Sequence, residues 1–126
     1  MRLNPDCIRD ILLYVEENID SKKIAVSTET LINSLTSYDE NTIHYHVQQI
    51  DKFNFVDRVA YGSGIPILIF DLSPNGHEFL AHIRSNNNWN KTKDIAKNIG
   101  VTSLDAFIQI ASTVTSDLIS KYFMGQ

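Results

Sequence analysis

The strongest constraint on the fold is the order of patterns between Lys23 and Arg84. The central stretch DENTIHYHVQQIDKFNFV places Ile43, Val47 and Ile50 on one face of a helix. A short strand pattern and a helix precede it, and a glycine-tipped hairpin and a further helix follow it. This order predicts a small α+β unit in which the hairpin accompanies the helices.

The helices of this segment and of the N-terminus carry clear end signals. Asn4 is a good helix cap, and Pro5 suits the first helical position. The first helix has apolar residues at helical spacing: Ile8, Ile11, Leu12, Val15 and Ile19. We expect a strand at Lys23–Ser27 and then a helix capped by Thr28. That helix is expected to bury Leu31, Ile32 and Leu35.

The next helix is expected to begin after the cap Asp39 and to end at Asn54, where a left-handed residue is often needed. The hairpin arms are expected at Val56–Tyr61 and Ile65–Asp71. The second arm contains an apolar run, Ile67 to Phe70, that does not alternate with polar residues. Such a run predicts that both faces are covered, the outer one by later helices or by a second subunit.

The C-terminal third is expected to be helical. Ser73-Pro74 opens a fourth helix, with Phe79, Leu80 and Ile83 inward. The polar stretch Ser85–Asn88 is expected to be a linker, which divides the chain into a domain at 1–84 and a helical extension at 85–126. A short helix is expected at Trp89–Ile99, ended by Gly100.

A last helix, capped by Ser103, has an apolar stripe. The stripe consists of Leu104, Phe107, Ile108, Ala111, Val114, Leu118 and Tyr122. This helix could cover the hairpin within one chain, or it could pair with its twin in a homodimer. The length of the chain favours neither alternative.

Two stretches resemble the winged helix-turn-helix superfamily. Thr42 to Ile50, followed by Phe53-Asn54-Phe55-Val56, resembles a recognition helix and its exit, and Asp71 to Leu80 resembles the join between a wing and the following helix. Leu3 to Leu12 and the helix joins are similar to a family of small phage and prophage proteins of unknown function. The resemblance implies an α+β winged helix-turn-helix, with three helices and a small antiparallel β-wing, extended by C-terminal helices.

In that fold the helix Asn41 to Lys52 would enter the major groove of DNA. The candidate DNA-binding residues are Asn41, Thr42, His44, Tyr45, Gln48, Gln49, Lys52 and Arg58. Gln48, Gln49 and His44 would read bases, whereas Lys52 and Arg58 would hold phosphates. The leading expectation is therefore a phage- or prophage-associated DNA-binding transcriptional regulator.

The charge of the chain argues against strong DNA affinity, because phosphate neutralisation supplies most of it. The 126 residues carry a net charge of −4, and residues 1–72 hold six Lys and Arg against eleven Asp and Glu. Four acids flank the helix: Asp39, Glu40, Asp51 and Asp57. The alternative is a winged helix without DNA binding that contacts a protein, as an adaptor or inhibitor of host transcription or defence machinery. Tyr45 and His44 also suit such an interface.

Lys91, Lys93 and Lys97, with Arg84, form a local basic excess in the C-terminal third. They could follow a phosphate backbone, although a solvated helix face is the favoured interpretation. Trp89 is expected to pack the short helix rather than to stack on a base.

Other classes of function lack a motif. His44 and His46 lie two residues apart and point in different directions on a helix, so no metal site is expected, and His46 is interpreted as a semi-buried packing residue. Cys7 is the single cysteine and is expected to be buried and inert. No catalytic constellation, cofactor motif, signal peptide or membrane-span pattern is present, so we expect a cytoplasmic protein that is not an enzyme.

Overall fold

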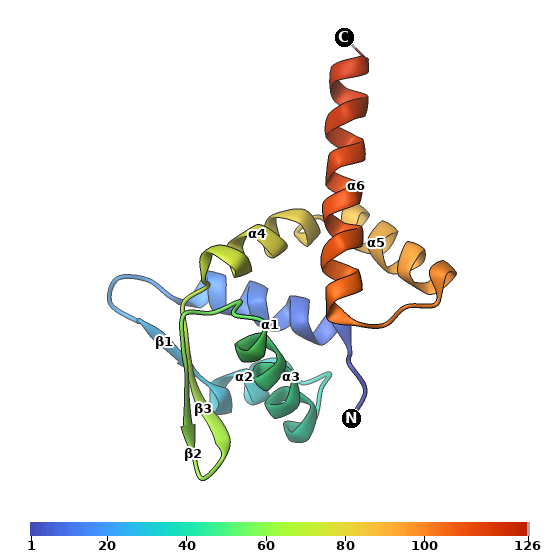
Figure 1. Ribbon diagram of the computed structural model, residues 1–126. Helices are drawn as coiled ribbons and strands as arrows, with labels where there is room; N and C mark the ends of the chain where they lie inside the picture. Colours follow the sequence, from blue (N-terminus) through green and yellow to red (C-terminus); the bar gives the residue numbers. More distant parts are fainter. Residues whose placement is uncertain (126) are drawn as a thin grey trace. The chain divides into compact units, whose positions relative to one another are not determined.

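The computed structural model describes residues 1–125. It divides into two compact units, Met1–His77 and Glu78–Gln126. The boundary thus falls before the polar stretch in which we expected it. The described part is an α+β structure with six helices and a small antiparallel sheet (Figure 1). Its elements are α1 (Pro5–Asn18), β1 (Ala25–Ser27), α2 (Thr28–Ser34), α3 (Glu40–Lys52), β2 (Val59–Gly62), β3 (Ile65–Phe70), α4 (Pro74–Ile83), α5 (Asn86–Ile99) and α6 (Leu104–Met124).

In the first unit, α1 begins as its sequence predicts. The side chain of Asn4 accepts hydrogen bonds from the main-chain N–H groups of Asp6 and Cys7, at 3.1 and 3.4 Å. The helix ends one residue earlier than its apolar stripe, because Ile19 is already extended. The core of the unit includes fully buried side chains from α1, α2, α3 and the sheet: Ile11, Leu12, Val15, Val26, Leu31, Ile43, Val47, Ile50 and Ile69.

The second helix differs from the expectation at its cap. Ser27, not Thr28, is the N-cap, and its hydroxyl accepts from the N–H of Thr30 at 3.1 Å. Thr28 is the first helical residue, and its buried hydroxyl donates to the carbonyl oxygen of Pro66 at 2.8 Å. This bond joins α2 to β3. Of the three apolar residues expected inside, Leu31 is buried, whereas Ile32 and Leu35 are partly exposed.

The sheet has the strand order β1-β3-β2, with both pairings antiparallel. The hairpin turns at Ser63 and Gly64, which both have positive φ angles, 53° and 79°. That pair is typical of the tight turn that matches the twist of a hairpin. Pairing is regular at Val59 with Ile69, but it shifts after Ala60, so that Ile67 has no partner on β2. The hairpin therefore contains a β-bulge at Ile67.

The bulge reverses the alternation of buried and exposed side chains along β3. We expected the apolar run Ile67 to Phe70 to be covered on both faces. Ile69 is fully buried, but Ile65 and Ile67 are 44% and 46% exposed. Cover of these two side chains by a second subunit stays a prediction.

The exit of α3 and the start of α4 are locked together by main-chain geometry. Asn54 adopts the left-handed conformation expected for it, with φ 56°. The hydroxyl of Ser73 donates to the carbonyl oxygen of Asn54, and the N–H of Ser73 donates to that of Phe55 at 3.0 Å. A Cβ atom on Gly76 would lie 1.9 Å from the Phe55 carbonyl oxygen, so only glycine fits there.

In the second unit, the expected linker is helical. Ser85 caps α5, and Asn86 to Asn88 form its first turn. Gly100 ends α5 in the left-handed conformation, as predicted. The rings of Trp89 and Phe107 lie 5.9 Å apart and pack α5 on α6, which confirms the expected packing role of the tryptophan.

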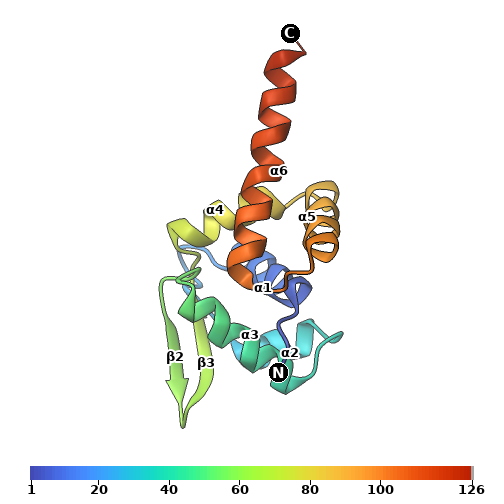
Figure 2. The same ribbon diagram turned by 45° about the vertical axis from the view of Figure 1, so that its right-hand side comes forward.

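The last helix is capped by Ser103 as predicted, but its apolar stripe is only half buried. Leu104, Phe107, Ala111 and Val114 are inside. The expected core residues Leu118 and Tyr122 are instead 41% and 67% exposed. Figure 2 shows that α6 continues well past α5.

In residues 1–125, no helix combines the length and the apolar character that crossing a membrane requires.

Candidate functional site

The third helix presents three faces. Its buried face consists of Ile43, His46, Val47 and Ile50. Helical spacing places four residues on the outward face: Asn41, Tyr45, Gln48 and Lys52. Glu40, His44 and Asp51 lie along the side that faces α2 and the hairpin. The structure thus separates the predicted DNA-binding residues into groups with different surroundings.

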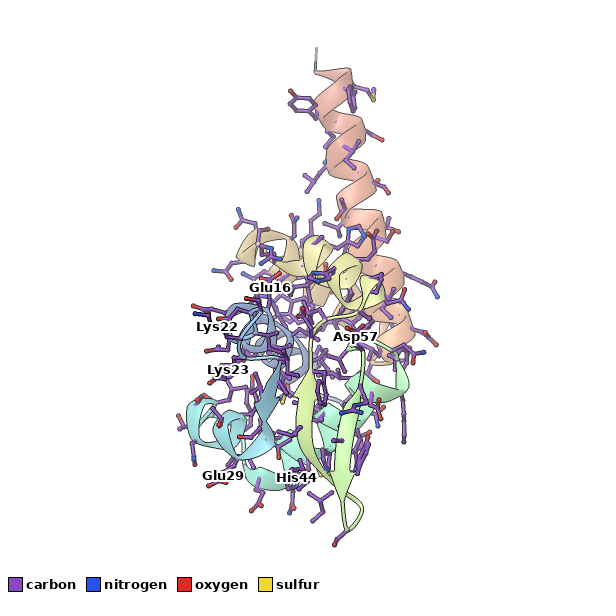
Figure 3. The ribbon with its side chains drawn as sticks, turned by 90° about the vertical axis from the view of Figure 1, so that its left-hand side faces the viewer. Glu16, Lys22, Lys23, Glu29, His44 and Asp57 are labelled. Carbon is purple, nitrogen blue, oxygen red and sulfur yellow. The ribbon has the colours of Figure 1, made fainter. Side chains whose placement is uncertain are left out.

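Alongside α3 lies a groove of about 400 Å³ between α2, α3 and β3. We call it the hairpin groove, and its lining comprises Thr28, Glu29, Ile32, Glu40, His44, Ile65, Pro66 and Ile67. Figure 3 shows Glu29 on α2 and His44 on α3 at the end of the first unit where the hairpin turns. Residues from three separate stretches of sequence therefore form one concave surface.

The hairpin groove is apolar with an acidic margin. Ile32, Ile65, Pro66 and Ile67 provide its apolar surface, and the side chains of Glu29 and Glu40 provide two carboxylates. Both glutamates are exposed. His44 is the basic side chain of the lining. A groove of this composition attracts cations and apolar groups, and it repels phosphate.

A hydrogen bond joins the hairpin to α3. The hydroxyl of Tyr61 on β2 donates to a carboxylate oxygen of Asp51 on α3 at 2.7 Å. Partial burial, followed by this hydrogen bond and the charge of Asp51, raises the pKa of Tyr61 to about 12. The phenol therefore stays protonated and keeps donating at neutral pH.

Three of the eight predicted DNA-binding residues lie away from both the outward face and the groove: Thr42, Gln49 and Arg58. Thr42 belongs to the helix cap, since its N–H donates to the carboxylate of Asp39 at 2.8 Å. Gln49 shares the flank of α3 on which Thr42 lies. On the outward face, Asn41 and Lys52 are exposed. Tyr45 and Gln48 lie between them and are partly exposed.

Arg58 and the lysines near β1 provide little positive charge beside the groove. The guanidinium of Arg58 lies 4.2 Å from the ring centre of Phe70, a cation–π contact at the far end of the hairpin from its turn. Lys22 and Lys23 precede β1 and lie away from Glu29 and His44 (Figure 3). Sequence patterns did not reveal Glu29, Ile32 or Pro66 as site residues, although the unbroken apolar run of β3 was a signal.

His46 is more deeply placed than the semi-buried position expected for it. It is fully buried, and it forms two hydrogen bonds. Its Nε2 accepts from the N–H of Asn4 at 2.7 Å, so its Nδ1 carries the proton and donates to the carbonyl oxygen of Thr42 at 2.7 Å. Burial lowers the pKa of His46, against a smaller raising effect of the Thr42 carbonyl. This neutral ring joins α3 to the start of α1.

Other candidate chemistry is limited in the described part. Among residues 1–125, no three His, Cys, Asp or Glu side chains gather as a metal site requires. Cys7 is fully buried, and burial followed by the charge of Asp10 raises the pKa of its thiol to about 12. Such a thiol is protonated and a poor nucleophile.

In the second unit, the ammonium of Lys93 lies 5.6 Å from the ring centre of Trp89.

Comparisons with known proteins place the chain in a family without an assigned activity. The chain belongs to the family described as "Hypothetical protein (DUF2513)", whose model matches residues 2–102. It is also similar to an uncharacterized protein of Haemophilus influenzae, with 29% identity over 123 residues. That alignment covers 95% of this chain and 100% of the relative. No solved structure matches the chain.

Proposed function

We propose that the chain is a winged-helix protein and that it binds a protein partner through α3 and the hairpin groove. The observation that carries the proposal is the groove itself, which combines four apolar side chains with the carboxylates of Glu29 and Glu40. In a winged helix, DNA that follows the recognition helix and the wing would pass this surface. Two carboxylates there oppose a phosphate backbone and favour a basic partner.

The element order supports the winged-helix assignment. A short strand precedes α2, α3 leads directly into the β2–β3 hairpin, and β3 lies between β1 and β2. The hydrogen bond between Tyr61 and Asp51 holds the hairpin beside α3, so helix and wing act as one surface. A rigid surface loses little conformational entropy when it binds.

The chemistry of the groove defines the segment that would fit it. An aliphatic or aromatic side chain would enter between Ile32 and Ile67, and an adjacent lysine or arginine would pair with Glu29 or Glu40. The role we propose is that of an adaptor or inhibitor of host transcription or defence machinery, encoded by a phage or prophage. The resemblance of the opening motif supports the phage context of this proposal.

Selection from a random peptide library on the purified chain tests the proposed specificity. We expect the selected peptides to carry Lys or Arg beside an apolar side chain. Their affinity, measured by fluorescence anisotropy, should fall at least tenfold with the double change Glu29→Lys and Glu40→Lys. Glu17→Lys, at an exposed position of α1, is the matched control. Peptides without a basic residue, or equal affinity in all variants, would refute the groove as the binding site.

A second candidate function is DNA reading by the outward face of α3. Asn41 and Gln48 carry amides that suit an adenine edge, and Lys52 on the same face suits a phosphate. Selection from random duplexes at low salt is the direct test. The DNA proposal requires enrichment of a sequence, with an affinity that falls only gradually as salt rises, because few cations are available.

A further inference from the structure

The C-terminal end of α6 presents an exposed apolar surface. It consists of Leu118, Ile119, Tyr122 and Phe123, which are 41%, 52%, 67% and 67% exposed and lie on adjoining sides of the helix. Single exposed apolar residues are ordinary on protein surfaces, but a contiguous group of four large ones marks an interaction surface. We call it the α6 end patch.

The patch is continuous with a surface that is already buried. Val114 is 1% exposed, and Leu118 and Tyr122 follow it at intervals of four residues on the same side of the helix. The apolar stripe of α6 therefore continues past Val114, where its side chains stop being buried. A stripe that continues for two helical turns beyond its cover is suited to packing against another helix.

We propose that the α6 end patch binds the same patch of a second copy of this chain, with the two helices antiparallel. Around a two-fold axis near Ile119, Leu118 lies against the partner subunit's Tyr122, and Tyr122 lies against the partner's Leu118. Such a contact is isologous, so each half of the patch meets the other half of its twin. This proposal does not depend on the protein-binding function of the hairpin groove.

Charge favours the antiparallel orientation. Asp117 and Lys121 are exposed and lie one turn apart on the same flank of α6. In an antiparallel pair, the flank of α6 that carries Asp117 and Lys121 lies beside the same flank of the second copy, and the two run in opposite directions. Asp117 then lies opposite the partner's Lys121, and Lys121 lies opposite the partner's Asp117. A parallel pair offers neither ion pair, because equivalent flanks lie apart.

The exposed area suits a weak, reversible dimer. An aromatic side chain buries about 150–250 Å², so four side chains at these exposures present on the order of 450 Å² per copy. Two copies would bury on the order of 900 Å², in the range of weak and transient complexes. We therefore expect a dimer that dissociates on dilution rather than a permanent one.

Sedimentation equilibrium of the full chain over a wide concentration range tests the proposal. We expect a reversible monomer–dimer equilibrium, and we expect Leu118→Asp with Tyr122→Asp to leave only monomer. Ser120→Asp is the matched control, because Ser120 is exposed on the opposite side of the same turns. All variants should keep the far-ultraviolet circular dichroism of the unmodified chain, since these side chains lie outside the core.

Charge reversal tests the orientation separately. Asp117→Lys or Lys121→Asp alone should weaken the dimer roughly three- to tenfold, because each change opposes like charges twice. The double variant Asp117→Lys with Lys121→Asp should restore the affinity. A monomer at every concentration, a dimer that persists in the Leu118 and Tyr122 variant, or a double variant as weak as the singles would overturn the proposal. Vesicle binding by a strictly monomeric chain would overturn it as well.

Discussion

The main-chain N–H of Asn4 donates a 2.7 Å hydrogen bond to Nε2 of His46, 42 positions further along the chain. Asn4 is also the N-cap of α1, so the same residue caps one helix and forms a hydrogen bond with a buried side chain of another. The bond requires a neutral imidazole, because a protonated ring has no acceptor. The junction of α1 and α3 therefore depends on pH.

We expect the free energy of unfolding to decrease when the pH is lowered below about 6.5, the ordinary pKa of histidine. Since burial lowers the pKa of His46 in the folded chain, the unfolded chain binds the proton first. The contribution is complete above the unfolded pKa and is lost as the pH falls through the folded one. Urea denaturation of His46→Gln should lack this decrease, whereas His44→Gln should retain it. Parallel pH profiles for both variants would contradict the prediction.

Replacing Gly76 by alanine should destabilise the first unit by roughly 2–4 kcal/mol, because the new methyl group would collide with the Phe55 carbonyl oxygen. The neighbouring residue Asn75 is exposed, so Asn75→Ala is the control for a change in the first turn of α4. Thermal denaturation compares the two variants. Equal melting temperatures would contradict the close approach of Gly76 to the Phe55 carbonyl.

Replacing Thr28 by valine should cost about 1–3 kcal/mol, because the carbonyl oxygen of Pro66 loses its buried donor. Thr28→Ser keeps the hydroxyl and should cost less. Chemical denaturation gives the stability of both variants. If serine and valine destabilise the chain equally, the methyl group rather than the hydrogen bond stabilises the contact between α2 and β3.

If a duplex is selected by the outward face of α3, two substitutions should separate base reading from phosphate binding. Gln48→Ala should relax the sequence preference, at a cost of about 1–3 kcal/mol for the preferred site. Lys52→Ala should weaken all duplexes by a similar factor and should lower the salt dependence by about one ion. Competition binding with preferred and scrambled duplexes distinguishes the two effects, and DNA reading by this helix fails if neither appears.

The sequence predicted those parts of the fold that depend on neighbouring residues. Helix caps and left-handed residues act within a few positions of the chain, so the sequence pattern predicts them. They are Asn4, Asp39, Ser103, Asn54 and Gly100. The α+β class and the element order followed from these signals. The N-cap of α2 is Ser27 rather than the predicted Thr28, because both residue types are good caps and the pattern does not separate them.

The parts that could not be predicted depend on residues that are distant in sequence. The hairpin groove joins Glu29 to Ile65 through the fold alone, and no local pattern reports that proximity. The helical spacing of Leu118 and Tyr122 is the same whether a partner covers them or not. Periodicity therefore found the stripe of α6 but not the point where its cover stops.

The β-bulge at Ile67 separates the hairpin into two parts with different surroundings. The pair Val59 and Ile69 belongs to the core and precedes the shift in register, whereas Ile65 to Ile67 follow it and line the groove. A substitution at the exposed Ile65 or Ile67 would change the shape of the groove without changing the pairing of Val59 with Ile69. Under the proposed function, such a substitution would alter the choice of partner while the bond from Thr28 to Pro66 still joins β3 to α2.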